Sequence, residues 1–247
     1  MGARTQIRIE IAHFLLVHGS CHGAWCWRDV HPALTALGHS SRAIDLPSGG
    51  ADTTPLEEVT LDLCAGSVLD AIDGPVIVVG HSAGGFPISR AADLRSDGIT
   101  RLVYLCAYVP RAGASLIGMR RSAPRQPLHG ALVKSGDGLS YSVDPTHARA
   151  AFYHDCPEEV VQFAQRNLRP QPILPQATAI TLGPGFATIP RSYILCEDDR
   201  AIPPEFQEVM AADFASQDVY HLPTSHSPFF SDPTKLAGLL DQITKQT

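Results

Sequence analysis

Ser82 is the residue whose type and setting best suit nucleophilic chemistry. It lies in the pentapeptide Gly80-His81-Ser82-Ala83-Gly84, directly after the continuous β-branched run 76–79 and before a predicted helix over 86–94. A buried strand, a Gly-x-Ser-x-Gly turn and a helix together form the setting in which a strained turn exposes a serine hydroxyl. The same turn points the N–H of Ala83 at the position of a developing oxyanion.

A serine hydroxyl needs a neighbouring base, which is usually an imidazole oriented by a carboxylate. In this fold pattern the chain order is serine, acid, histidine, and the last two follow later strands. His226 lies in the polar loop 223–228 after the predicted strand 219–222, and we expect it to be the base. Asp199 follows the predicted strand 191–196, and we expect it to be the acid.

Neighbouring residues offer alternatives to both. Glu197 and Asp198 directly precede Asp199, so a shift of one position would change which carboxylate points inward. Asp199 is favoured because it adjoins an apolar turn that would bury the loop. His221 lies inside a predicted strand, which favours a structural role, and His81 is expected to point away from the serine hydroxyl.

A second loop, after the first predicted strand, contains His18-Gly19-Ser20 and continues to Trp25. Glycine lets such a loop bend so that a backbone N–H, here that of Ser20, faces the nucleophile as a second oxyanion donor. We expect Trp25 and Trp27 to pack this loop down. Gly19, His81 and Trp25 are the residues expected to border the substrate.

These residues require a scaffold that gathers strand ends at one edge. Strands are predicted over 7–17, 41–46, 76–79 and 99–106, with helices over 30–37, 55–72 and 86–94 between them. Strands that alternate with helices indicate an α/β fold with a doubly wound, mostly parallel sheet. After the irregular part of the chain, the pattern resumes with strands 191–196 and 219–222 and helices 204–214 and 233–243.

Residues 109–190 interrupt the pattern, with many prolines and one convincing helix, 158–167. The stretch is too long for an ordinary loop and predicts a mainly helical cap insertion over the carboxyl edge of the sheet, between core segments 1–108 and 191–247. Its apolar residues could line a hydrophobic pocket or form the insertion's own core; they are Leu116, Ile117, Met119, Leu128, Leu132, Tyr141, Phe152, Tyr153, Phe163 and Phe186.

Composition limits the partners. The 247 residues carry a formal net charge of −6 and no basic run, which argues against nucleic acid or an anionic membrane surface. No apolar stretch could span a bilayer, and residues 1–10 lack the apolar core of a secretory signal. Six scattered cysteines are typical of free thiols in a reducing cytoplasm.

Cys21 and Cys26, with His18 and His22 nearby, are candidate metal ligands. No second Cys or His pair follows at zinc-finger spacing, so no metal site and no cofactor are expected. An apolar patch on the insertion could make a homodimer, but the sequence does not indicate one.

Over essentially its whole length the chain resembles the α/β-hydrolase superfamily. The stretch 16–27, the acid loop 196–203 with 205–207, and the segment 223–233 are similar to the plant methylesterase and hydroxynitrile lyase branch and to bacterial pyrethroid-type carboxylesterases. The resemblance implies a triad of Ser82, His226 and Asp199, a cap over the pocket, no cofactor, and hydrolysis of esters with bulky apolar parts.

Two positions depart from the lyases of that branch. Those enzymes have threonine where Gly19 stands and lysine directly after the histidine, where this chain has Ser227. Without the threonine hydroxyl and the positive charge, a departing cyanide has no electrostatic partner. The sequence therefore predicts a cytoplasmic serine hydrolase acting on small hydrophobic esters; the alternatives are an acid–base lyase or cyclase on the same scaffold and a non-hydrolytic small-molecule receptor.

Overall fold

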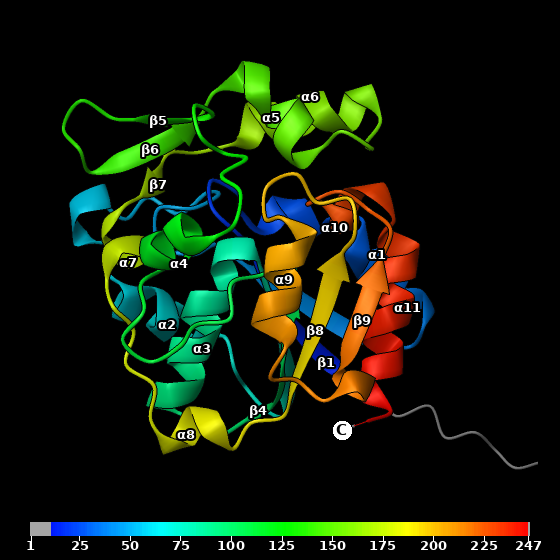
Figure 1. Ribbon diagram of the computed structural model, residues 1–247. Helices are drawn as coiled ribbons and strands as arrows, with labels where there is room; N and C mark the ends of the chain where they lie inside the picture. Colours follow the sequence, from blue (N-terminus) through cyan, green and yellow to red (C-terminus); the bar gives the residue numbers. More distant parts are fainter. Residues whose placement is uncertain (1–10, 247) are drawn as a thin grey trace, which may run out of the picture.

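A six-stranded parallel sheet forms the centre of the computed structural model, which describes residues 11–246 (Figure 1). The strands are β1 (His13–Val17), β2 (Ser40–Ile44), β3 (Val76–His81), β4 (Ile99–Leu105), β8 (Arg191–Cys196) and β9 (Val219–Leu222), in the order β2-β1-β3-β4-β8-β9. Every neighbouring pair is parallel. The carboxyl ends of all six strands therefore meet at one edge, as the doubly wound pattern predicts.

Helices cover both faces of this sheet. α1 (Val30–Ala36) and α11 (Pro233–Thr244) pack together on one face, and α2 (Leu61–Asp70), α3 (Gly85–Leu94) and α9 (Pro204–Ala211) lie on the other. Along β1, Phe14 and Leu16 join the first apolar cluster while Leu15 and Val17 join the second. Because both faces are covered, the strands are continuously apolar rather than alternating.

Most predicted core elements are confirmed within one to three residues, and two differ more. The predicted helix 55–72 is wrong as a single helix, because a short 3-10 helix, η2 (Leu56–Glu58), precedes α2. Thr60 is extended between them, and its side chain caps α2 by accepting the N–H of Leu63 at 3.0 Å. The first strand begins at His13 rather than Ile7, and positions 7–10 lie outside the described residues.

Residues 109–190 contain five short helices and a three-stranded antiparallel sheet: α4 (Leu116–Ser122), β5 (Leu132–Lys134), β6 (Ser140–Val143), α5 (Pro145–Phe152), α6 (Glu158–Asn167), β7 (Gln171–Pro172), α7 (Leu174–Ala177) and α8 (Pro184–Ala187). β5, β6, α5 and α6 lie above the end at which β8 and β9 finish, whereas α8 lies near the opposite end (Figure 1). Only α6 was predictable, since strands of two to four residues are too short to show a period.

Short 3-10 and α-helices complete the chain: η1 (Ala24–Trp27), η3 (Ser82–Gly84), η4 (Ser216–Asp218) and α10 (Pro228–Ser231). All six cysteines are free thiols and all are buried. Among residues 11–246, no helix combines the length and the apolar character needed to cross a bilayer.

Candidate active site

Ser82 occupies the sharp turn between β3 and α3. Its φ of +53° lies in the left-handed region, which a serine adopts only when its surroundings impose it. The Tyr108 N–H donates to the Ser82 carbonyl at 3.1 Å and holds this conformation. Glycine is required next to the turn, because a β-carbon on Gly84 would lie 2.7 Å from the carbonyl oxygen of His18.

His226 and Asp199 form a buried pair. Asp199 Oδ2 accepts a hydrogen bond from His226 Nδ1 at 2.6 Å and another from Gln207 Nε2 at 2.9 Å. Its other oxygen, Oδ1, accepts the N–H groups of Ala201 at 2.6 Å and Ile202 at 2.9 Å. Four donors therefore compensate the buried carboxylate and fix its orientation.

The structure separates the three neighbouring acids by burial. Asp199 is buried, while Glu197 and Asp198 are exposed. Glu197 lies 3.3 Å from Nδ1 of His221, whose side chain is also exposed on β9. The apolar turn Ala201-Ile202, noted in the sequence, supplies the two backbone donors that draw Asp199 inward.

Ser82 and His226 line one pocket, which we call the serine cavity. Its other walls are Ser20, Cys21, His22, His81, Tyr108, Leu116, Arg120, Leu128, Leu132, Tyr141, Val143, Phe152, Ala201 and Ile202. Five residues that the sequence assigned either to a pocket or to the insertion's own core thus border this cavity. By contrast, Phe186 packs in the apolar cluster beside α3, and Phe163 packs edge-on against Trp25.

The loop after β1 approaches the serine closely. A β-carbon on Gly19 would lie 2.8 Å from the β-carbon of Ser82, so glycine is needed for this contact. Ser20 follows and lines the serine cavity. His22 Nδ1–H donates to the Ser20 carbonyl at 2.7 Å, and the Tyr153 hydroxyl donates to His22 Nε2 at 2.7 Å. These bonds fix the loop that contains the Ser20 amide.

Burial keeps the histidines around the serine neutral. It lowers the pKa of His22 to about 3, and it lowers the pKa of His81 well below its ordinary value. The pKa of His18 is also lowered by burial. Neutral imidazoles can both donate and accept, which is how His18 and His22 each bridge two groups.

A second cavity adjoins the first and is bordered by Ala83, Phe86 and Gln176. Ser20 lies between the two cavities and lines both. Gln176 Nε2 donates to Ser20 Oγ at 2.8 Å, and the Tyr141 hydroxyl donates to Gln176 Oε1 at 2.9 Å. Because Tyr141 lines only the serine cavity, this pair of hydrogen bonds forms part of the wall between the two.

Comparison with known proteins agrees with this architecture. The model of a family described as the alpha/beta hydrolase family matches residues 14–239. The chain belongs to the alpha/beta hydrolase family. Methylesterase 4 of Arabidopsis thaliana is 34% identical over 250 residues, which cover 93% of this chain and 95% of that protein.

Solved structures similar to this alpha/beta hydrolase include a pyrethroid hydrolase from Sphingobium faniae JZ-2, with a TM-score of 0.85 and 26% identity over 96% of this chain and 98% of the other. A methylesterase protein from Arabidopsis, MES16, has a TM-score of 0.83 and 26% identity over 96% of this chain and 100% of the other. These likenesses extend across the core and residues 109–190 alike.

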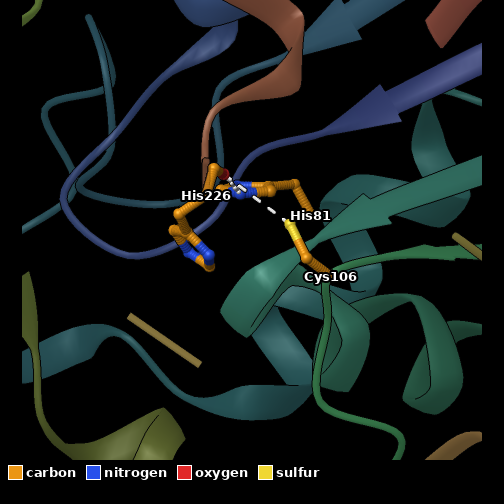
Figure 2. A group of neighbouring side chains, drawn as sticks. All are labelled: His81, Cys106 and His226. Carbon is orange, nitrogen blue, oxygen red and sulfur yellow. Dashed lines mark hydrogen bonds between the residues drawn. The ribbon is translucent and has the colours of Figure 1, made fainter. Parts of the chain in front are cut away.

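In this alpha/beta hydrolase, His81 and Cys106 hold the loop that contains His226. His81 Nε2–H donates to the His226 carbonyl at 2.8 Å, and the Cys106 thiol donates to the same oxygen at 3.6 Å (Figure 2). Side-chain atoms of all three lie within 4.8 Å of one another, a spacing that could hold a metal ion. Burial raises the pKa of the Cys106 thiol, which keeps its proton and favours hydrogen bonding over metal ligation.

The remaining predicted residues have distinct surroundings. Gly19 lines the second cavity and His81 the serine cavity. Trp25 is not among the residues that line either; it stacks on His22 at 5.2 Å between ring centroids and on Phe230 at 6.2 Å. Its position corresponds to the packing role expected from the sequence, and not to the expectation that Trp25 borders the substrate.

Sequence reasoning missed several residues that the structure brings to the site. Gln207 orients Asp199, Tyr108 holds the serine turn, Gln176 forms part of the wall between the two cavities, and Arg120 lines the serine cavity. Gln207 and Tyr108 left a weak signal, since each is a buried polar residue in or next to a predicted element. The other two come from the irregular insertion, where no periodicity indicates orientation.

Proposed function

We propose that this chain is a serine esterase in which Ser82, His226 and Asp199 form a catalytic triad. The observation that carries the proposal is the meeting of Ser82 and His226 at one cavity, with the His226 Nδ1 bound to a buried Asp199 at 2.6 Å. Nδ1–H donates to Asp199, so Nε2 is left as the basic nitrogen.

Acylation follows from this arrangement. His226 Nε2 takes the proton of the Ser82 hydroxyl as the oxygen attacks the ester carbonyl carbon. The N–H groups of Ser20 and Ala83 stabilise the oxyanion of the tetrahedral intermediate. The imidazolium, stabilised by Asp199, then protonates the departing alcohol and leaves an acyl-serine.

Deacylation uses the same groups. Water enters, His226 takes its proton, and the hydroxide attacks the acyl carbon. The second tetrahedral intermediate collapses with return of the proton to Ser82, and the carboxylic acid leaves. This sequence requires only side chains, backbone amides and water.

The proposed substrates are small esters with an apolar part. Leu128, Leu132 and Phe152 supply apolar walls to the serine cavity, next to the proposed nucleophile. Relatives named as methylesterases and a pyrethroid hydrolase support ester cleavage. We further propose that residues 109–190 act as the cap of this site, since they contribute these three walls.

Ser82→Ala tests the nucleophile. We expect this variant to lose hydrolysis of 4-nitrophenyl butyrate by about 10⁴-fold or more while retaining the far-ultraviolet circular dichroism of the wild type. Intact mass after treatment with a fluorophosphonate should show one adduct on the wild type and none on the variant. A folded Ser82→Ala protein with wild-type turnover would exclude the mechanism.

Trapping of the acyl intermediate separates the rival functions. A lyase or cyclase that uses His226 only as acid and base would turn over without an acyl-serine, so quenching during ester turnover would show no acyl adduct. A receptor would bind small apolar molecules tightly without releasing acid. Accumulation of an acyl adduct on the peptide that contains Ser82 would exclude both.

A further inference from the structure

Arg120, on α4, stands where the serine cavity meets a wider surface hollow. It lines the serine cavity together with Ser82 and His226. It also lines a neighbouring hollow, which we call the outer basin and which shares Tyr108 and Leu128 with the serine cavity. The guanidinium of Arg120 is therefore the charged group at the junction between solvent and the proposed nucleophile.

This charge lacks an acidic partner. Among residues 11–246, no carboxylate lies within ion-pair distance of the Arg120 guanidinium, whose carbon is 5.9 Å from the centre of the Tyr141 ring. By comparison, Arg125 at the outer basin is bound through two hydrogen bonds to Glu205, at 2.5 and 2.8 Å. Arg120 is half-buried, so water compensates it only in part.

The walls of the two spaces next to Arg120 carry further positive charge and no carboxylate. Arg121 also lines the outer basin, and neither the basin nor the serine cavity has an Asp or Glu among its lining residues. This local excess contrasts with the chain's net charge of −6. A cleft lined by one sign of charge concentrates ligands of the opposite sign.

The field of Arg120 reaches the cavity interior. Burial and, to a lesser extent, the Asp199 charge raise the pKa of Tyr108, and the Arg120 charge acts in the opposite direction. The same opposition holds at Tyr141, whose hydroxyl faces Gln176. An anion bound near these two rings would therefore experience the guanidinium charge at reduced dielectric, where charge-assisted hydrogen bonds are strongest.

We propose that the substrate of this enzyme is an ester that carries a carboxylate, and that Arg120 binds this carboxylate. This inference rests on the proposed function. It narrows the proposed substrates from small apolar esters to esters that also carry a carboxylate. Arginine suits this task, since its planar guanidinium is permanently charged and can bind a carboxylate through two hydrogen bonds. Arg120 would act as a specificity determinant, without a part in the bond-breaking steps.

Two pairs of shape-matched esters test this. In the first, 4-nitrophenyl hemiglutarate, which has a carboxylate on the acyl chain, is compared with 4-nitrophenyl 5-methylhexanoate, where an isopropyl group replaces the carboxylate. In the second, the butyrate ester of 4-hydroxybenzoate is compared with that of 4-isopropylphenol, which places the charge on the alcohol. kcat/KM is measured for each ester.

We expect the wild type to favour the charged member of at least one pair, and Arg120→Gln to reduce that preference by about tenfold or more through a higher KM. Arg120→Lys should restore part of it, because the positive charge is retained. The preference should also fall as ionic strength rises, while turnover of the neutral ester stays constant. Arg166→Gln, an exposed arginine on α6 that lines neither space, makes the same charge change and should leave the preference unaltered.

The outcomes separate two failures. Hydrolysis of the neutral esters with a charged-to-neutral ratio that is the same in the wild type and Arg120→Gln would overturn this inference and leave the esterase proposal standing. Failure of the wild type to hydrolyse any of the four esters, with no fluorophosphonate adduct, would overturn the esterase proposal and this inference together.

Discussion

Asp199 illustrates how single residues prepare this site. A buried carboxylate is expensive unless its oxygens are fully hydrogen-bonded, and four donors meet that need here. Two of these donors are backbone N–H groups of the following turn, and one is the amide of Gln207. The carboxylate is therefore held in place before any substrate arrives, and so is the imidazole of His226 bound to it.

Asp199→Asn should lower kcat for ester hydrolysis by about 10³- to 10⁴-fold, because an amide at this position allows the wrong imidazole tautomer and does not stabilise imidazolium. Asp198→Asn is the matched control; this neighbouring side chain is exposed, and its loss should leave kcat within about twofold. Steady-state kinetics on both variants makes the comparison. Equal losses from the two substitutions would mean that the acid has been assigned to the wrong residue.

Among single residues, the sequence predicted those whose position along the chain determines their position in space. Ser82, Asp199 and His226 follow predicted strands, and parallel strands end at one edge, so their meeting could be expected. Gln176 and Arg120 come from a segment without periodic pattern. Their orientation depends on tertiary packing, which no local feature of the sequence encodes.

The β3–η3–α3 element depends on close backbone contacts as well as on the serine. A β-carbon at Gly85 would lie 2.0 Å from the carbonyl oxygen of Tyr108, and the N–H of Tyr108 in turn binds the Ser82 carbonyl. The start of α3 is thus locked against the strand-to-loop junction after β4. The motif was predictable from its spacing, whereas the partner segment across from it was not, because that contact joins distant parts of the chain.

Gly85→Ala should lower the free energy of unfolding by about 3 kcal/mol, since the obstructing atom belongs to the backbone and cannot rotate away. Gly66→Ala provides the opposite case. That glycine lies inside α2 with no atom within 4 Å of the added carbon, so helix propensity should raise stability by about 0.5–1 kcal/mol. Urea denaturation measures both. A Gly85→Ala protein as stable as the wild type would contradict the tight packing of this element.

Across the whole molecule, residues 109–190 are attached to the loops that contain Asp199 and His226. Asp155 accepts the N–H of Ser225 at 2.7 Å, and His154 Nε2–H donates to the Asp198 carbonyl at 2.9 Å. Arg28 directly follows η1, and its guanidinium lies 4.1 Å from the centre of the Phe163 ring on α6. This adds a contact between residues 109–190 and the core. The sequence indicated an insertion above the sheet, but these attachments depend on side chains whose partners lie tens of residues away.

The buried neutral histidines make global stability depend on pH. His18, His22 and His81 have lowered pKa values in the folded state through burial, whereas in the unfolded chain they titrate near 6.5. As pH falls below about 6.5 the unfolded state therefore binds more protons than the folded state, and stability declines, by up to about 1.4 kcal/mol per pH unit for each histidine. His22 contributes down to about pH 3.

We expect the free energy of unfolding to fall between pH 7 and pH 5, and to fall less steeply in His22→Asn, where this titrating group is absent. Urea denaturation at several pH values gives the slopes, which can be compared even when the variant is less stable at every pH. An unchanged slope in the variant would show that His22 takes up a proton equally well in both states.

The wall between the two cavities affects how the range of molecules that fit this protein can evolve. It consists in part of Gln176, joined by side-chain hydrogen bonds to Ser20 and Tyr141, and the second cavity lies behind it. A smaller residue at position 176 would remove both hydrogen bonds of this wall and leave Ser82, His226 and Asp199 untouched. Substitution at this single position is therefore expected to change which molecules fit the site, while the three residues of the proposed triad stay the same.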